Sequence, residues 1–233
     1  MSDTTLPVDA FEERRVTELR IAQNKAERLF HEVEARSLIR PAISESRLNE
    51  EIYRLAKEMY GITTYWHKRI VRAGRNTLAP YAENSPDLTI GEDDILFLDL
   101  GPVFGDWEAD FGRTFVIGSD PLKLKLRNDV GQAFAEGKRY FHETPDIRAS
   151  QLFSYAVSLA HQFGWEFGGS IAGHLIGQFP HEKIVGDKVT CMFILRVICR
   201  CDPSTRKAGR AIGFSRSISS TANIKSAASL GNC

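Results

Sequence analysis

Four side chains of metal-binding types stand at an informative spacing in this sequence. Asp99 ends the apolar run ILFLDLG, and Asp110 follows eleven residues later in ADFGRTF. His174 and His181 lie in the segment GHLIGQFPHE. Carboxylate oxygens and imidazole nitrogens are ligands for hard-to-borderline divalent metal ions. We therefore predict that these four residues belong to one metal-dependent site.

The two aspartates are predicted to approach each other across a pair of strands. In a hairpin, Asp99 and Asp110 can face the same side, one from each strand. Two close carboxylates repel each other, and a cation between them removes that cost. The alternative is a capped turn with solvated acids. Against it, Asp99 interrupts a strongly apolar strand, where an unpaired charge is costly.

The two histidines lie among small residues. His174 has glycines close on both sides in the sequence, which lets backbone and metal approach closely. His181 is placed to contact substrate or to shuttle a proton at neutral pH. The alternative for a lone loop histidine is an ordinary polar residue. Two of them downstream of the aspartate pair favour the functional interpretation.

Two helices are predicted ahead of the site. Apolar residues recur with helical period over residues 10–36, and a second helix is predicted between a cap at Ser44 and a terminating Gly61. The residues expected to face the core are Leu19, Ala22, Ala26, Leu29, Phe30 and Val33 in the first helix, and Leu48, Ile52, Leu55, Ala56 and Met59 in the second.

The middle of the chain is predicted to mix strands and helices. ILFLDLG reads as a buried strand, GDWEAD as a turn and FGRTFVIG as an antiparallel second strand. Two more helices are expected over about 121–141 and 149–163, and residues 164–184 return to glycine-rich loop and strand. The expected inward residues are Leu122, Leu126, Val130, Ala133 and Phe134, then Leu152, Ala156, Leu159 and Ala160.

Composition narrows the class of protein. The chain has 233 residues, 42% of them hydrophobic, with 30 Lys+Arg against 30 Asp+Glu. This balance favours a globular chain with neither a nucleic-acid nor a membrane partner. Without an apolar leader or bilayer-length run, the expected compartment is the cytoplasm. The four cysteines all fall in the last 43 residues in no common zinc pattern, so they are interpreted as incidental.

The motifs resemble those of the creatinase, prolidase, aminopeptidase P and methionine aminopeptidase family. LDLGPVFGDWEAD matches its pair of aspartates, and GHLIGQFPHE matches its GHGIG…HE segment, with Leu175 in place of a usual glycine. The resemblance implies the α/β (α+β) pita-bread fold, a curved and mostly antiparallel sheet with outer helices. The expected organisation is an N-terminal helical segment (1–60) of the catalytic domain, the rest of that domain (61–190) and an aberrant tail (191–233).

The resemblance also assigns roles. It implies that Asp99, Asp110 and His174 are metal ligands, with Asp110 bridging, and that His181 is the substrate-side histidine. His67 in YWHKRIVRAG resembles another histidine near the substrate, with a surface residue as the alternative. In this family two divalent ions (Mn, Co, Fe or Zn) activate a water that attacks the N-terminal peptide bond of a peptide, often one before proline. A homodimer is compatible with the resemblance.

The family site needs two further ligands, both glutamates, and this chain contains no Glu after Glu182. The tail from Cys191 can be back-translated with synonymous codons chosen freely. With one added base, the resulting nucleotides can be read in another frame. The new reading is a strand-like sequence with glutamates in the segments ILEIHL and FFGEL. We therefore hypothesise a one-base deletion near Thr190–Cys191. The expectation for the chain as written is weak or absent metal and little peptidase activity.

Two alternatives to a dinuclear peptidase follow from the same resemblance. One is a non-catalytic peptide- or protein-binding pita-bread domain, which the missing glutamates favour. The other is a metal-independent creatinase-like amidinohydrolase. The retained aspartates and histidine favour the peptidase branch over the latter.

Overall fold

The computed structural model describes residues 8–169, 171–174, 176–180 and 224–225. The described helices are α1 (Val8–Ala35), α2 (Glu45–Tyr60), a 3-10 turn η1 (Gly74–Leu78), α3 (Pro121–Glu143) and α4 (Ala149–Gln162). The described strands are β1 (Ile70–Ala73), β2 (Ile95–Leu100), β3 (Val103–Phe104), β4 (Trp107–Glu108), β5 (Phe111–Val116), β6 (Glu166–Phe167) and β7 (Ile224–Lys225). The aberrant tail and the domain boundaries stay predictions, since most of 181–233 lies outside the described residues.

Helices α1 and α2 confirm the predicted amphipathic front of the chain. Every expected inward residue of α1, and all but the half-buried Met59 of α2, is buried in one apolar cluster with the sheet. Helix α2 starts where Ser44 accepts a hydrogen bond from the Arg47 N–H at 3.2 Å. It ends at Gly61, whose φ of 68° lies in the left-handed region that glycine adopts without a steric penalty.

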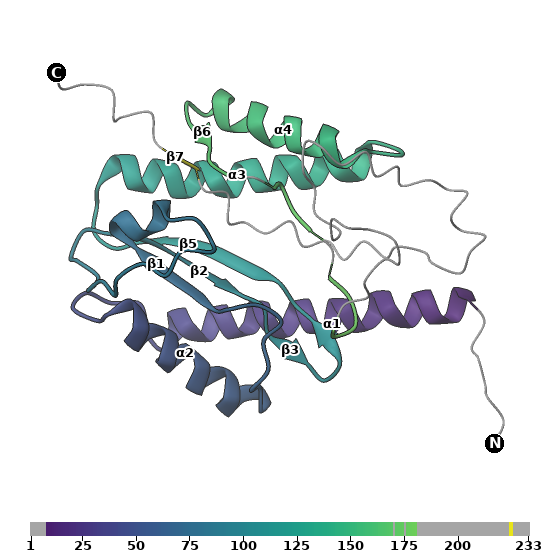
Figure 1. Ribbon diagram of the computed structural model, residues 1–233, viewed down its shortest axis with the longest axis horizontal. Coiled ribbons are helices and arrows are strands. Elements are labelled where there is room, and N and C mark those ends of the chain that lie inside the picture. Colours follow the sequence, from purple (N-terminus) through teal and green to yellow (C-terminus); the bar gives the residue numbers. More distant parts are fainter. Residues whose placement is uncertain (1–7, 170, 175, 181–223, 226–233) are drawn as a thin grey trace.

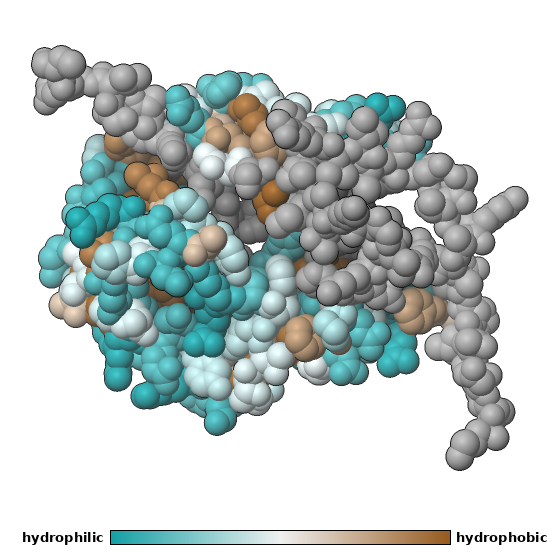
Figure 2. Space-filling model, viewed as in Figure 1, coloured by the Kyte–Doolittle hydropathy of each residue, from teal (hydrophilic) through white to brown (hydrophobic). Residues whose placement is uncertain are grey.

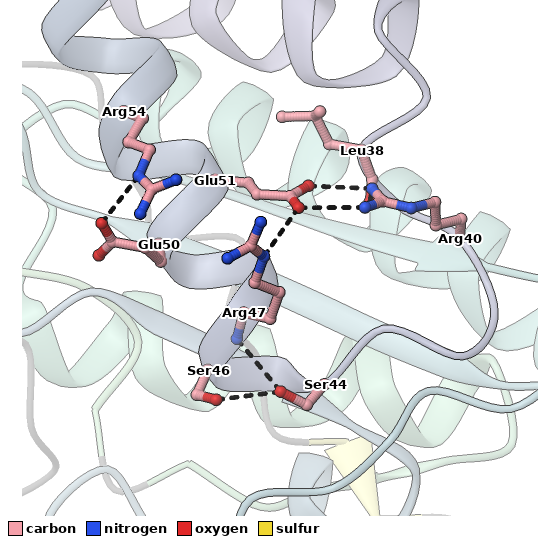
Figure 3. Close-up of polar contacts among 8 residues, drawn as sticks. All are labelled: Leu38, Arg40, Ser44, Ser46, Arg47, Glu50, Glu51 and Arg54. Carbon is pink, nitrogen blue, oxygen red and sulfur yellow. Dashed lines mark hydrogen bonds and ion pairs between the residues drawn. The ribbon is translucent and has the colours of Figure 1, made fainter.

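Three ion pairs that differ in exposure involve the polar face of α2, and they are drawn in Figure 3. Glu51 accepts from Arg40 at 3.0 Å and from Arg47 at 3.1 Å, and its side chain is only 16% exposed. The pair between Arg54 and Glu50 is exposed on both sides. The Glu51 contacts also join α2 to the loop that precedes it.

Strand β2 is the centre of a three-stranded antiparallel sheet in the order β1–β2–β5. Its side chains alternate: Leu96, Leu98 and Leu100 enter the core with α1 and α2, while Phe97 and Asp99 face the other way. The predicted antiparallel pairing of the two strands is therefore confirmed. The predicted turn between them is itself a short hairpin, β3–β4.

The sheet lies between α1 and α2 on one side of the view and α3 and α4 on the other (Figure 1). Helix α3 packs against β5, and α4 packs against α3. A second apolar cluster, built on Val130, Ala160 and Trp165, joins α3 to α4 and β6, with Leu126 packed against it. The expectation that Leu122 faces inward is wrong: it is 49% exposed, because this cluster reaches α3 only one turn later.

The hydropathy of the surface fits the arrangement of the helices around the sheet. In Figure 2 the part of the view where α2 lies is mainly hydrophilic or neutral, as expected for the outer face of an amphipathic helix. Among the described residues, none of the helices is both long enough and apolar enough to span a bilayer.

Candidate metal centre

Strand register places the two aspartates on one face of the sheet. Asp99 pairs with Gly112 across β2 and β5, so these two residues face the same side. Asp110 precedes Gly112 by two residues and therefore returns to that side. Both aspartates are buried, Asp99 at 9% exposure and Asp110 at 2%. The predicted meeting of these carboxylates is confirmed.

His67 joins the carboxylates from the loop before β1. Its Nε2 lies 3.8 Å from Asp99 Oδ1 and 3.7 Å from Asp110 Oδ1. Its Nδ1 lies 2.7 Å from the carbonyl oxygen of Lys68. A carbonyl oxygen can only accept, so Nδ1 carries the proton of that hydrogen bond. The ring therefore has its other nitrogen directed at the two acids.

His174 reaches the opposite oxygen of the same aspartate. Its Nε2 lies 2.9 Å from Asp110 Oδ2. The segment that carries it is fixed by Glu108, which is fully buried on β4. The Glu108 side chain accepts from the Gly177 N–H at 3.1 Å, and the Glu108 N–H donates to the Gly177 carbonyl at 3.0 Å. Glu108 thus holds the backbone three residues after His174.

Trp66 contacts both imidazoles and is hydrogen-bonded to the segments around them. Its ring centroid lies 4.3 Å from that of His67 and 4.9 Å from that of His174. Its indole N–H donates to the Ala109 carbonyl at 2.8 Å, and its backbone N–H donates to the Gly101 carbonyl at 2.9 Å. Both aspartate-bearing segments are therefore attached to the residue next to His67.

Close charges shift the protonation of the site. Burial opposes a charge on His67, but its polar contact with Asp110 and the nearby charges of Asp99 and Asp110 outweigh burial, so the pKa of His67 is raised. Burial likewise works against the Asp110 carboxylate, yet its contacts with His174 and His67 prevail and lower the pKa of Asp110. The site is arranged around negative carboxylates that attract cations.

A fixed loop forms the rim of the site. Arg72, buried on β1, donates to three backbone carbonyls within residues 79–83. The loop presents Tyr81, which is 50% exposed and whose ring centroid lies 6.2 Å from that of His67. The Tyr81 hydroxyl accepts from the Lys68 N–H at 3.3 Å. The aromatic ring at this rim is therefore held in place.

The residues present fit a divalent metal ion. One donor atom each from His67, Asp99 and Asp110 lies within 4.8 Å of the others, and carboxylate with imidazole suits Mn, Fe, Co or Zn. The backbone leaves room for this cluster at Gly101, where a Cβ would lie 2.4 Å from His67 Cδ2 and 2.5 Å from Trp66 Nε1. No other residue type fits that position without moving the histidine.

The structure brings together Asp99, Asp110 and His174 from the predicted site, and it adds His67 to them rather than leaving it on the surface. His181 lies outside the described residues. The metal-ligand and catalytic roles of all five remain predictions.

Sequence reasoning missed Trp66, Gly101 and Glu108. None of the three has a sequence signal that marks it, because each owes its place to contacts with residues distant in the sequence.

The chain belongs to metallopeptidase family M24, whose model matches residues 17–196. It is 28% identical over 116 residues to an Xaa-Pro dipeptidase from Pyrococcus horikoshii, a match that covers 48% of this chain and 32% of that protein. The family predicted from the motifs is therefore confirmed.

Solved structures agree on the fold. An X-Pro aminopeptidase from Thermotoga maritima superimposes with a TM-score of 0.64 at 19% identity, covering 82% of this chain and 53% of that one. An Xaa-Pro dipeptidase from Bacillus anthracis gives 0.63 at 22% identity, covering 80% and 50%. The chain thus has the predicted pita-bread fold. It spans about a third of the curated relative and about half of each solved structure.

Proposed function

We propose that this chain carries the site of a metal-dependent aminopeptidase-like hydrolase of the Xaa-Pro aminopeptidase or prolidase type. The observation that carries the proposal is the convergence of His67, Asp99, Asp110 and His174 at one end of a β-hairpin. Family membership and relatives that are named as Xaa-Pro peptidases support a peptide substrate.

The proposed roles follow the chemistry of each group. Asp99, Asp110 and His174 would hold divalent metal, and Asp110 could offer both of its oxygens, which face different imidazoles. Bound metal would supply an activated water and polarise the scissile carbonyl. His181 is proposed as the substrate-side histidine. The held ring of Tyr81 would bound the space beside His67 where a peptide enters.

We further propose that the chain as written is impaired. No Glu follows Glu182, so the two glutamate ligands of a complete dinuclear site are absent from the sequence. Losing ligands weakens metal binding and with it the supply of activated water. Weak metal binding and little peptidase activity are the expected behaviour, with manganese or cobalt as the ions to try first. A cytoplasmic location and a homodimer remain predictions.

The proposal is tested by comparing two proteins. One is this chain, and the other has the reading frame after Thr190 restored by one added base. Both are assayed on Xaa-Pro dipeptides and on proline-containing peptides with Mn²⁺ or Co²⁺. The restored chain is expected to cleave them and to lose cleavage on Asp110→Asn, while this chain cleaves little. A restored chain that folds, binds metal and hydrolyses none of these peptides would refute the assignment.

A non-catalytic peptide-binding domain is the second candidate. The absence of Glu after Glu182 favours it for the chain as written. It predicts that the restored chain binds proline-containing peptides with unchanged affinity on Asp110→Asn and turns none of them over. Peptide titration beside the activity assay separates the two candidates.

A further inference from the structure

Lys68 places a positive charge at the rim of the candidate site. Its ammonium nitrogen lies 5.0 Å from the centroid of the Tyr81 ring, and the centroid of the same ring lies 6.2 Å from that of His67. The backbone of Lys68 is held on both sides, since its N–H donates to the Tyr81 hydroxyl at 3.3 Å and its carbonyl lies 2.7 Å from His67 Nδ1. A peptide of two residues is about 7 Å long, so a ligand of that size can contact both the site and the ammonium group.

The ammonium group of Lys68 has neutral partners within the described part of the chain. It donates to the Glu83 carbonyl at 3.3 Å and to Asn84 Oδ1 at 3.4 Å. Both contacts are longer than the usual hydrogen bond of about 2.9 Å. A carboxylate forms a shorter and stronger charge-assisted bond with an ammonium group. The charge of Lys68 is therefore available to an anionic group of a ligand.

The two arginines on either side of this segment are engaged elsewhere. Arg72 donates to three backbone carbonyls within residues 79–83 and holds the rim loop. Arg69 donates to Asn49 on α2 at 2.7 Å. Of these three basic side chains, Lys68 is the one whose charge stands beside the Tyr81 ring without such a commitment.

The charge of the site makes a cation at the rim useful for one class of peptide. Asp99 and Asp110 are buried, and two negative groups disfavour a third carboxylate nearby. In a dipeptide the C-terminal carboxylate lies one residue from the bond to be cleaved, whereas in a longer peptide it lies further away. The relatives include proteins named as a dipeptidase and as an aminopeptidase, so family membership leaves this choice open.

We propose that Lys68 is a specificity-determining residue that binds the C-terminal carboxylate of a dipeptide. The Tyr81 ring holds the ammonium group by a cation–π contact, and the carboxylate replaces the two long contacts with neutral oxygens. The inference deepens the proposed function and rests on its placing of a peptide at this site. It assigns the site to dipeptides with a free carboxylate rather than to longer or amidated peptides.

The test compares two ligands that differ in one charge, alanyl-proline and its C-terminal amide. Each is titrated into this chain with Mn²⁺ present, and binding is followed by ligand-observed NMR. The free acid is expected to bind about 3–10-fold more tightly than the amide, a range between that of an exposed ion pair and that of a hydrogen bond to a charged group. The preference should shrink in 0.5 M NaCl, because salt screens an exposed pair.

Substitutions of lysine separate the role of this charge from a general loss of structure. Lys68→Met should abolish the preference for the acid while leaving the affinity for the amide unchanged, and Lys68→Arg should keep the preference. Lys57→Met removes the same charge from an exposed position on α2 and should change neither affinity. Circular dichroism checks that each variant folds, and Lys68→Gln replaces Lys68→Met if the latter does not.

The inference is overturned if this chain binds neither ligand, if it binds both equally, or if Lys68→Met keeps the preference. The peptidase proposal has a separate fate, because it depends on hydrolysis by the frame-restored chain. A restored chain that cleaves the acid and the amide at equal rates would support the peptidase and contradict the role of Lys68. A restored chain that cleaves neither, beside a preference that depends on Lys68, would refute the peptidase and leave Lys68 as a carboxylate-binding residue.

Discussion

Replacing Gly101 with alanine should displace His67 and destabilise the fold. A Cβ at this position would lie 2.4 Å from His67 Cδ2, 2.6 Å from its Nε2 and 2.5 Å from Trp66 Nε1. A normal contact of about 3.5 Å requires a shift of about 1 Å. Overpacking of this kind costs about 1–3 kcal/mol. For a chain of this length that corresponds to a melting temperature roughly 2–12 °C lower.

The assay is thermal unfolding of the metal-free protein, followed by circular dichroism, with a double-mutant cycle. His67→Ala removes one of the two rings that the new methyl group meets, so Gly101→Ala should cost less in that background, with a coupling above about 0.5 kcal/mol. Gly131→Ala is the control, because a Cβ there meets no atom within 4 Å in the middle of α3. It should raise stability by about 0.5–1 kcal/mol.

The reasoning would be refuted by a Gly101→Ala protein that melts with the unsubstituted chain. Additivity of the two substitutions would also refute it, since the glycine and the imidazole would then not share the same space. Either result would remove the steric support for His67 as a resident of the site.

Three further outcomes are expected. Glu108→Ala leaves the Gly177 N–H without its acceptor, so it should lower stability by about 1–3 kcal/mol and speed amide exchange at Gly177. Glu108→Gln keeps an acceptor oxygen and should lower stability less. The pKa of Glu51 is lowered chiefly by the hydrogen bond that Arg40 donates to it, so the stabilisation is present above the ordinary glutamate pKa of about 4.3 and is lost as pH falls through the folded pKa. Glu51→Gln should cost about 0.5–1 kcal/mol at pH 7 and progressively less as the carboxylate becomes protonated, and Glu50→Gln, in an exposed pair, should cost less. Arg72→Lys should lower the melting temperature, because an ammonium group cannot reach all three carbonyls that the guanidinium holds. For each of these variants, an unchanged melting temperature would contradict the stabilising role given to the contact that it removes.

Elements with a periodic sequence were predictable. The inward residues of α1 and α2 recur every three or four positions, and the caps at Ser44 and Gly61 have the residue types that those backbone positions require. The aspartate pair was predictable for a similar reason. An apolar strand, a short connection and a second strand leave few registers, and Asp99 and Asp110 fall on one face in the observed register.

Contacts between distant loops were not predictable in this way. His67 lies in a segment without periodicity, and its position depends on hydrogen bonds from Trp66 to residues more than thirty positions later. Glu108 is a charged residue in an expected turn, yet it is buried because it binds the backbone of Gly177. Leu122 keeps the helical period of α3 but lies beyond the part of α3 that its neighbours cover.

The order of the site residues along the chain has a consequence for biosynthesis. His67, Asp99 and Asp110 all precede α3, and every buried member of the main apolar cluster except Ile176 also lies at or before Ala109. Local units of this kind can fold as they emerge during translation, before later segments exist. We expect a nascent chain that ends after β5 to bury most of this cluster, and to bring His67 towards the two aspartates, while it is still attached to the ribosome. His174 would then be the last of these four residues to arrive, at an Asp110 whose surroundings are already folded.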